Sequence, residues 1–172
     1  MKDGFVHIYC GDGKGKTTAA IGLALRCSGN GFKVLYCSFL KNTCSGEHKA
    51  VTPIDILKCD FIDKFCFQMN EEENGAAAQN TKKYFAEATK KSKQENYDML
   101  VLDEVLDAID VGYLTEDELA EVIDEKPKNQ EIVITGRRAG EKIQARAQYI
   151  SEIKCIKHPY EQGINARCGI EF

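Results

Sequence analysis

The fold of this chain is decided by residues 11–18, Gly11-Asp12-Gly13-Lys14-Gly15-Lys16-Thr17-Thr18. The stretch follows residues 4–10 (GFVHIYC), which are typical of a buried strand, and opens into residues 19–27 (AAIGLALRC), which are typical of a helix. A glycine-rich turn between a strand and a helix, ending in Gly-Lys-Thr, is the pattern of a phosphate-binding P-loop. We therefore predict that residues 11–18 bind the phosphates of a nucleotide.

The residue types of this stretch suit phosphate chemistry. Glycine lets backbone N–H groups converge on phosphate oxygens, and the helix start adds unpaired N–H groups and the positive end of its dipole. Lys16 is expected to reach the phosphates, and the Thr17 hydroxyl to bind Mg²⁺. Cys10 departs from the strict pattern, because it stands where a first glycine is usual. The plainer alternative is a glycine-rich turn with two solvated lysines.

A second informative stretch is residues 98–104, DMLVLDE. It is an apolar strand that ends in Asp103 and Glu104, and such a strand delivers a carboxylate beside the P-loop in nucleotide-binding α/β proteins. Carboxylate oxygens are ligands that Mg²⁺ prefers. We therefore expect Thr17, Asp103 and Glu104 to form a metal site. Strands often end in aspartate for other reasons, so this prediction depends on the P-loop upstream.

The rest of the chain alternates predicted strands with predicted helices. Strands are expected at 33–40, 54–57, 131–135 and 149–153, and helices at 75–95, from 115 onward and at 141–147. Glu71–Glu73 suits the solvated start of the first of these helices, and Thr115 with Glu118 predicts a capping box. Residues 61–67 are apolar and fit either a strand or a loop.

This alternation predicts an α/β fold with a mostly parallel, doubly wound sheet. Ligands of such sheets bind outside the carboxyl ends of the strands. Arg137 follows the strand at 131–135 and is therefore expected at that edge. There it can meet a phosphate or form an ordinary surface ion pair.

The length suits one domain over residues 1–172, and 43% hydrophobic and 29% charged residues are an ordinary balance for a soluble globular chain. The formal net charge of −4 argues against broad nucleic-acid binding, which needs a basic face. No apolar run is long enough to span a bilayer, and the first strand begins too early for a signal peptide. We expect a cytoplasmic protein with neither nucleic acid nor a membrane as partner.

The eight cysteines are numerous for a chain of this length. No two have the Cys-x-x-Cys spacing of a zinc or redox motif. Several stand where predicted strands and helices need apolar residues. We expect reduced, mostly buried thiols, with a metal cluster as the alternative.

Several stretches, taken in order, resemble the ATP:corrinoid adenosyltransferases related to the bacterial cobalamin adenosyltransferase. They are residues 11–20, 102–104 and 134–137 and the ending Lys157-His158-Pro159, Gly163, Ala166 and 169–172. The resemblance spans nearly the whole chain, and its most specific parts are the loop with its extra Lys14 and the C-terminal signature. It implies a P-loop NTPase fold with a RecA-like sheet, typically in a homodimer.

The resemblance also implies a reaction with ATP, Mg²⁺ and a corrinoid, either cobalamin or cobinamide. Co(I) attacks the 5′-carbon of ATP, adenosylcorrinoid forms and the whole triphosphate leaves. A flavoprotein or another reductant would supply Co(I). Lys14, Lys16 and Arg137, with Mg²⁺, would neutralise the leaving group. Phe65 and Phe67 match the aromatic pair that controls the lower face of cobalt in the family, with ordinary packing as their alternative.

Two other functions stay open at this point. One is a P-loop ATPase or small-molecule kinase, against which the sequence offers no Arg-rich lid and no acceptor site. The other is a nucleotide-dependent module that delivers a corrinoid to a partner enzyme. The chain departs from the family at Gly140, where many members have proline, at Gln148, where many have aspartate, and at Cys168 in the C-terminal signature. None of these positions belongs to the phosphate-binding stretch.

Overall fold

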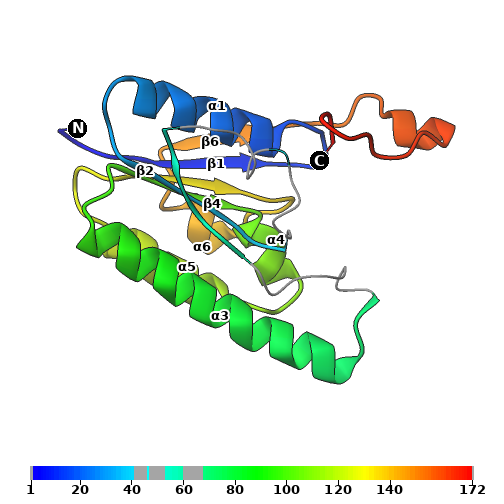
Figure 1. Cartoon of the computed structure of the whole chain (residues 1–172), viewed down its shortest axis with the longest axis horizontal. Helices are drawn as coiled ribbons and strands as arrows, with labels where there is room; N and C mark the ends of the chain where they lie inside the picture. Colours follow the sequence, from blue (N-terminus) through cyan, green and yellow to red (C-terminus); the bar gives the residue numbers. More distant parts are fainter. Residues whose placement is uncertain (1, 41–45, 47–52, 60–67, 172) are drawn as a thin grey trace.

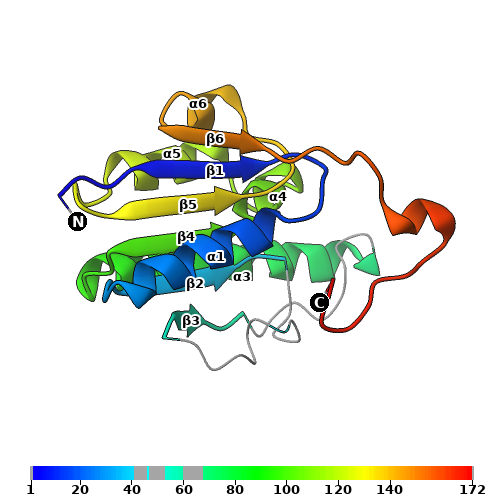
Figure 2. The same ribbon diagram turned by 90° about the horizontal axis from the view of Figure 1, so that it is seen from above.

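The computed structural model describes residues 2–40, 46, 53–59 and 68–171, and a six-stranded sheet forms its centre (Figure 1). The strands lie in the order β3-β2-β4-β5-β1-β6, and each pair of neighbours is parallel (Figure 2). Their bounds are β1 Val6–Cys10, β2 Val34–Ser38, β3 Asp55–Leu57, β4 Met99–Asp103, β5 Glu131–Thr135 and β6 Tyr149–Glu152. Because the strands are parallel, their carboxyl ends meet at one edge of the sheet.

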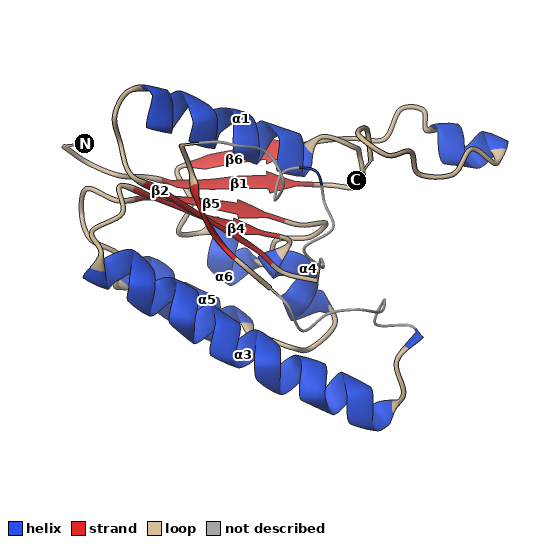
Figure 3. Ribbon diagram, viewed as in Figure 1, coloured by secondary structure: helices blue, strands red, loops and turns tan. Residues whose placement is uncertain are grey.

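Helices cover both faces of this sheet (Figure 3). The described helices are α1 Lys16–Gly29, α3 Glu71–Gln94, α4 Val105–Asp110, α5 Glu116–Asp124 and α6 Glu141–Gln144, followed by a short 3₁₀ turn, η2, at Pro159–Gln162. Of these, α1 lies on one face, and α3 to α6 lie on the other. The predicted class, an α/β fold with a doubly wound parallel sheet, is confirmed.

Two hydrophobic cores lie between the sheet and its helices, one on each face of the sheet. Ala20 and Ala24 of α1 share one core with Val101 of β4. Leu100 and Leu102 belong to the other core, beside α3 to α6, because successive residues of a strand point to opposite faces. Both faces of β4 are therefore buried, which explains its uninterrupted apolar sequence.

The longest helix, α3, begins with a capping box. The Asn70 side chain accepts a hydrogen bond from the Glu73 N–H at 2.8 Å, and the Glu73 carboxylate accepts one from the Asn70 N–H at 3.0 Å. The capping box predicted at Thr115 and Glu118 is also present, at the start of α5. None of the helices in the described part of the chain is both long and apolar enough to cross a membrane.

The predicted element bounds need three corrections. Helix α1 begins at Lys16 rather than at residue 19, because Gly15 of the loop serves as its N-cap. Helix α3 already begins at Glu71, in the acidic stretch predicted as its solvated start, rather than at residue 75, because the capping box fixes its first turn. Helix α6 ends at Gln144 rather than at residue 147, because beyond the C-cap Ala145 the N–H groups of Arg146 and Ala147 bond to carbonyls three residues back.

Helix α4 was not predicted. It follows β4 directly, with Glu104 at a left-handed φ of 61° as its N-cap and no side-chain cap bond. The sequence therefore carries no helix-start signal at this position. Residues 61–67, which fit either a strand or a loop by sequence, lie outside the described residues.

Candidate active site

The predicted P-loop joins β1 to α1 at the carboxyl edge of the sheet. Gly15 has a φ of 119°, a backbone conformation that favours glycine, and α1 begins at the next residue. The first-turn N–H groups of α1 have no partners within the helix, so they are available to an anion there. Lys16 Nζ donates to the Gly13 carbonyl oxygen at 2.9 Å, which holds its ammonium over the loop.

The glycines of the loop are also required by the segment that follows β6. The Gly13 N–H donates to the Ile153 carbonyl oxygen at 2.8 Å. A Cβ added at Gly13 would lie 2.7 Å from backbone atoms of Ile153 and Lys154, and one added at Gly11 would collide with the Ile153 carbonyl oxygen. Gly11 also has a φ of 107°. Backbone packing, and not only phosphate binding, therefore selects glycine at both positions.

Asp103, at the end of β4, is the centre of a buried hydrogen-bonded cluster. Its side chain is fully buried, and hydroxyls from three elements donate to it. Thr17 of α1 donates to Oδ1 at 3.0 Å, Tyr36 of β2 to Oδ2 at 2.8 Å, and Thr135 of β5 to Oδ1 at 2.6 Å. The two motifs singled out in the sequence are thus joined directly.

The oxygen ligands of this cluster fit a magnesium ion. Mg²⁺ binds carboxylate, hydroxyl and water oxygens, and in P-loop proteins the loop Ser or Thr and an aspartate at a strand end hold it. Thr17 Oγ1 and both carboxylate oxygens of Asp103 lie within 3.1 Å of each other here. No group of three or more His, Cys, Asp or Glu able to hold a metal occurs within the residues that the structure describes.

Glu104 enters the site through its backbone. Its N–H donates to Thr135 Oγ1 at 2.8 Å, so Thr135 links the ends of β4 and β5. The neighbouring helix α4 presents Asp107, whose carboxylate accepts from the Arg137 N–H at 3.0 Å. Burial raises the pKa of Asp107, and the bond from the Arg137 backbone and the charge of its side chain act in the opposite direction. Arg137 itself is exposed, at the edge of the sheet where it was expected.

Two further loop residues contact the C-terminal segment. Asp12 Oδ1 accepts from the Cys155 N–H at 3.2 Å, which ties the loop to the chain beyond β6. Lys14 Nζ donates to Glu171 Oε1 at 2.8 Å. The sequence did not predict either contact.

The structure brings most of the predicted residues to one edge of the sheet. The loop from Gly11 to Thr18, Asp103, Glu104 and Arg137 meet there, whereas Phe65 and Phe67 lie outside the described residues. The residues that the prediction missed are Tyr36, Thr135, Asp107 and Glu171. Thr135 stands in a stretch that carries the family resemblance. The bond from its hydroxyl to Asp103 could not be predicted, because it depends on β5 lying beside β4 in the sheet.

The fold and the loop geometry define the class of protein. A parallel sheet whose first strand leads through this glycine-rich loop into a helix, with an aspartate at another strand end bonded to the loop threonine, is a P-loop NTPase fold. Among solved structures, a KaiC-like protein from Pyrococcus horikoshii OT3 is similar, with a TM-score of 0.54 and 15% identity over 88% of this chain and 73% of that one. At this identity the likeness supports the fold alone.

Sequence comparison then identifies the family. The family model described as ATP:corrinoid adenosyltransferase BtuR/CobO/CobP matches residues 2–172. The corrinoid adenosyltransferase of Escherichia coli (strain K12) is 31% identical over 170 residues, covering 98% of this chain and 86% of the relative. The corrinoid adenosyltransferase CobA of Salmonella typhimurium (strain LT2) is 31% identical over 175 residues, with the same coverage. This chain belongs to the ATP:corrinoid adenosyltransferase family and is therefore a transferase, which confirms the resemblance.

Proposed function

We propose that this chain transfers the 5′-deoxyadenosyl group of ATP to the Co(I) centre of a reduced corrinoid. In this step the cobalt electron pair forms a bond to the 5′-carbon. The bond between that carbon and its oxygen breaks, and inorganic triphosphate leaves with the bonding electrons. The observation that carries the proposal is the direct contact of Thr17 with Asp103, which joins the two nucleotide-binding motifs in a chain of this family.

The proposed roles follow from where charge develops. The leaving triphosphate gains negative charge at the oxygen that departs from the 5′-carbon, so the transition state needs cations and N–H donors around it. Lys14, Lys16 and the first turn of α1 supply them, and Arg137 stands at the same edge. Thr17 and Asp103 would hold Mg²⁺, with Glu104 as the second candidate carboxylate, and the ion would neutralise phosphate charge.

Alkyl transfer to a strong cobalt nucleophile needs no general base. The hydroxyls and carboxylate around Asp103 are committed to each other, which suits a positioning role better than proton transfer. What the reaction does need is control of the lower face of cobalt. We propose Phe65 and Phe67 for that role, on the strength of their match to the family pattern.

The proposal includes a physiological setting. The protein would act in the cytoplasm as a homodimer, and a flavoprotein or another reductant would supply Co(I). The proposed domain is the whole of residues 1–172. Sedimentation of the purified protein, with a capture experiment using reduced flavoproteins, tests the dimer and the reductant separately.

Product analysis tests the reaction. Chemically reduced cobalamin or cobinamide is incubated with the protein and MgATP, the corrinoid spectrum is followed, and phosphorus NMR identifies the phosphate product. We expect triphosphate in proportion to adenosylcorrinoid, with little ADP and no steady hydrolysis without corrinoid. Stoichiometric ADP and phosphate would instead establish an ordinary P-loop ATPase or kinase. Binding of both ligands without any product would establish a delivery module.

A further inference from the structure

The C-terminal segment returns to the P-loop through one carboxylate. After β6 the chain extends away from the sheet and then turns back toward its carboxyl edge (Figures 1 and 2). At the end of this path Glu171 Oε1 accepts from Lys14 Nζ at 2.8 Å. The same carboxylate accepts from the Arg167 backbone N–H at 2.8 Å and from its guanidinium at 3.1 and 3.2 Å.

The rest of this segment has little support from the body of the protein. Every residue from 159 to 170 is exposed, including Tyr160 at 71% and Ile170 at 57%. The Glu171 side chain is only 19% exposed, whereas that of Lys14 is 45% exposed. Among the described residues, the ion pair between Lys14 and Glu171 is therefore the contact that holds the end of this segment against the phosphate-binding loop.

The contact of Glu171 with Lys14 resembles the contact that a phosphate oxygen would make with the same ammonium. A carboxylate oxygen on a P-loop ammonium occupies the kind of position that a phosphate oxygen takes. Arg167 and Lys14 hold the pKa of Glu171 down to about 2, so this carboxylate stays charged at any working pH. A triphosphate carries several negative charges, so it attracts Lys14 more strongly than one carboxylate does and repels Glu171.

We infer that Glu171 is an internal, displaceable competitor of the triphosphate for Lys14. Phosphate binding releases Glu171 and frees Lys14, and the return of Glu171 after adenosyl transfer favours departure of the triphosphate product. The inference rests on the proposed function, because it needs the loop to bind phosphates. The Lys14 side chain is 45% exposed, so water screens the ion pair and limits its strength, which suits a contact that opens in each cycle.

Binding of inorganic triphosphate, with magnesium and without corrinoid, tests this inference. Calorimetry compares the wild type with Glu171→Gln, which removes the charge and keeps the shape of the side chain. The matched control is Glu161→Gln, an equal charge change at an exposed position of the same segment. We expect Glu171→Gln to bind triphosphate about five- to twentyfold more tightly than the wild type, and Glu161→Gln to bind as the wild type does.

Each other result is informative. Unchanged or weaker binding by Glu171→Gln overturns the inference, and so does equal tightening in both variants, which would reflect net charge alone. Failure of the wild type to bind triphosphate removes the proposed nucleotide site itself, so the two failures are distinguishable. A tighter Glu171→Gln with an unchanged melting temperature excludes a merely structural role, since loss of a structural contact does not strengthen binding.

Hydrogen exchange in the segment supplies a second readout. In the wild type, saturating triphosphate should increase the exchange rate of residues 167–171, because the segment is released. In Glu171→Gln the rate should already be high and should not respond to the ligand. Equal protection of these residues in both proteins, with and without triphosphate, would contradict the inference.

Discussion

Thr17 Oγ1 lies 3.0 Å from Asp103 Oδ1, although the two residues are 86 positions apart in the sequence. The contact joins the start of α1 to the end of β4 across the carboxyl edge of the sheet. The Asp103 side chain has no solvent exposure, and hydroxyl donors from three elements satisfy its carboxylate oxygens. The geometry of the proposed magnesium site is therefore fixed by the packing of the sheet itself.

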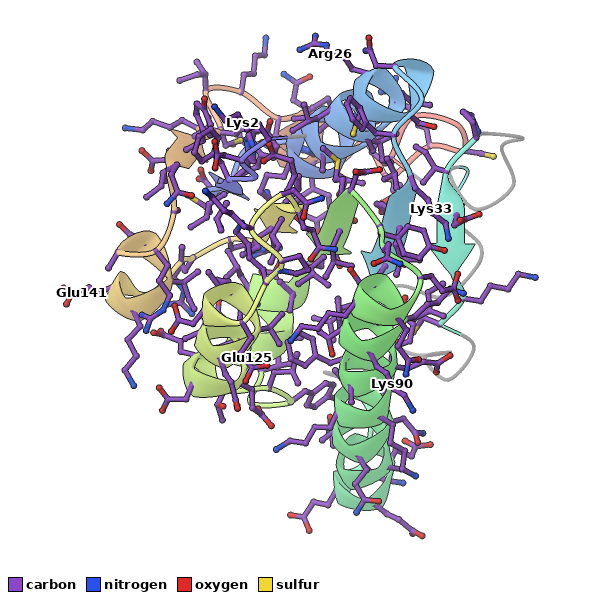
Figure 4. All side chains as sticks on the ribbon, turned by 90° about the vertical axis from the view of Figure 1, so that its left-hand side faces the viewer. Lys2, Arg26, Lys33, Lys90, Glu125 and Glu141 are labelled. Carbon is purple, nitrogen blue, oxygen red and sulfur yellow. The ribbon has the colours of Figure 1, made fainter. Side chains whose placement is uncertain are left out.

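Replacing Lys16 by alanine should nearly abolish ATP binding and turnover. Among the described residues, Lys16 Nζ donates one hydrogen bond, to the Gly13 carbonyl oxygen. Loss of the side chain should therefore leave the fold intact while removing a cation at the phosphates. Calorimetric titration with MgATP measures the effect. The control is Lys90→Ala, an exposed residue on α3 that Figure 4 shows on the far side of the molecule from α1. Unchanged ATP affinity and rate in Lys16→Ala would remove the P-loop assignment.

Replacing Asp103 by asparagine should affect both stability and metal use. An amide NH₂ would face hydroxyl donors where a carboxylate now accepts from Thr17, Tyr36 and Thr135, at a cost of about 1–3 kcal/mol. The Mg²⁺ concentration needed for half-maximal activity should also rise. Urea unfolding and a metal titration of the rate measure the two effects separately.

Glu104→Gln is the companion variant for that experiment. Glu104 contributes its backbone N–H to the site, which the substitution leaves in place, so stability should change little. If Glu104 also holds the metal, Glu104→Gln will raise the Mg²⁺ concentration needed for half-maximal activity as well. A metal dependence that moves in neither variant would contradict the assignment of a carboxylate at the end of β4 to Mg²⁺.

Adding a methyl group at Gly13 should destabilise the protein. The new Cβ would lie 2.7 Å from backbone atoms of Ile153 and Lys154, which cannot shift without moving the end of β6, so we expect a loss of about 1–3 kcal/mol. Gly22→Ala is the matched control, because it lies in α1 with open space around it and should gain about 0.5–1 kcal/mol. Urea unfolding of both variants gives the comparison, and equal stabilities would show that the segment beyond β6 yields easily.

Replacing Phe65 or Phe67 by alanine should impair the corrinoid step and leave ATP binding largely intact. The expectation follows from the family pattern, because the two residues match the aromatic pair at the lower face of cobalt. Electron paramagnetic resonance of a Co(II) corrinoid with MgATP measures cobalt coordination directly. The wild type should perturb the spectrum strongly and the variants weakly. Equal spectra would assign both residues to ordinary packing.

The cysteines should differ widely in reactivity. Cys37 has no solvent exposure, and burial raises the pKa of its thiol, so at neutral or mildly alkaline pH it holds its proton and lacks the reactive thiolate. Cys168 is exposed, so among the six cysteines that the structure describes it should react first with iodoacetamide. Mass spectrometry of native and denatured samples measures both rates. Labelling of native Cys37 at the rate of Cys168 would contradict the described packing.

The sequence predicted those parts of the site that are local in the chain. The P-loop and the strand ending in Asp103 are continuous stretches whose residue types have direct chemical reasons, and the structure brings them together. Tyr36 and Thr135 could not be assigned in the same way, because their hydroxyls reach Asp103 only through the order β2-β4-β5. That order is a property of the folded sheet and not of any one segment.

Helix starts show the same limit on a smaller scale. The capping box at Thr115 was predicted because its two members are three residues apart, whereas α4 begins without a side-chain cap and was missed. The contact of Lys14 with Glu171 spans almost the whole chain, so no local pattern indicates it. Contacts between single side chains far apart in the sequence were therefore the part of the site that could be found only in the folded structure.

The close approach of Ile153 and Lys154 to Gly11 and Gly13 predicts which loop residues would be retained after a gene duplication. A duplicated copy that no longer handled nucleotides would still retain both glycines, because a larger residue would disturb the backbone beside β6. Lys16 would be under no such constraint, since its ammonium donates one hydrogen bond to a loop carbonyl. In such a lineage the presence of the lysine, and not of the glycines, would distinguish copies that bind nucleotide from copies that do not.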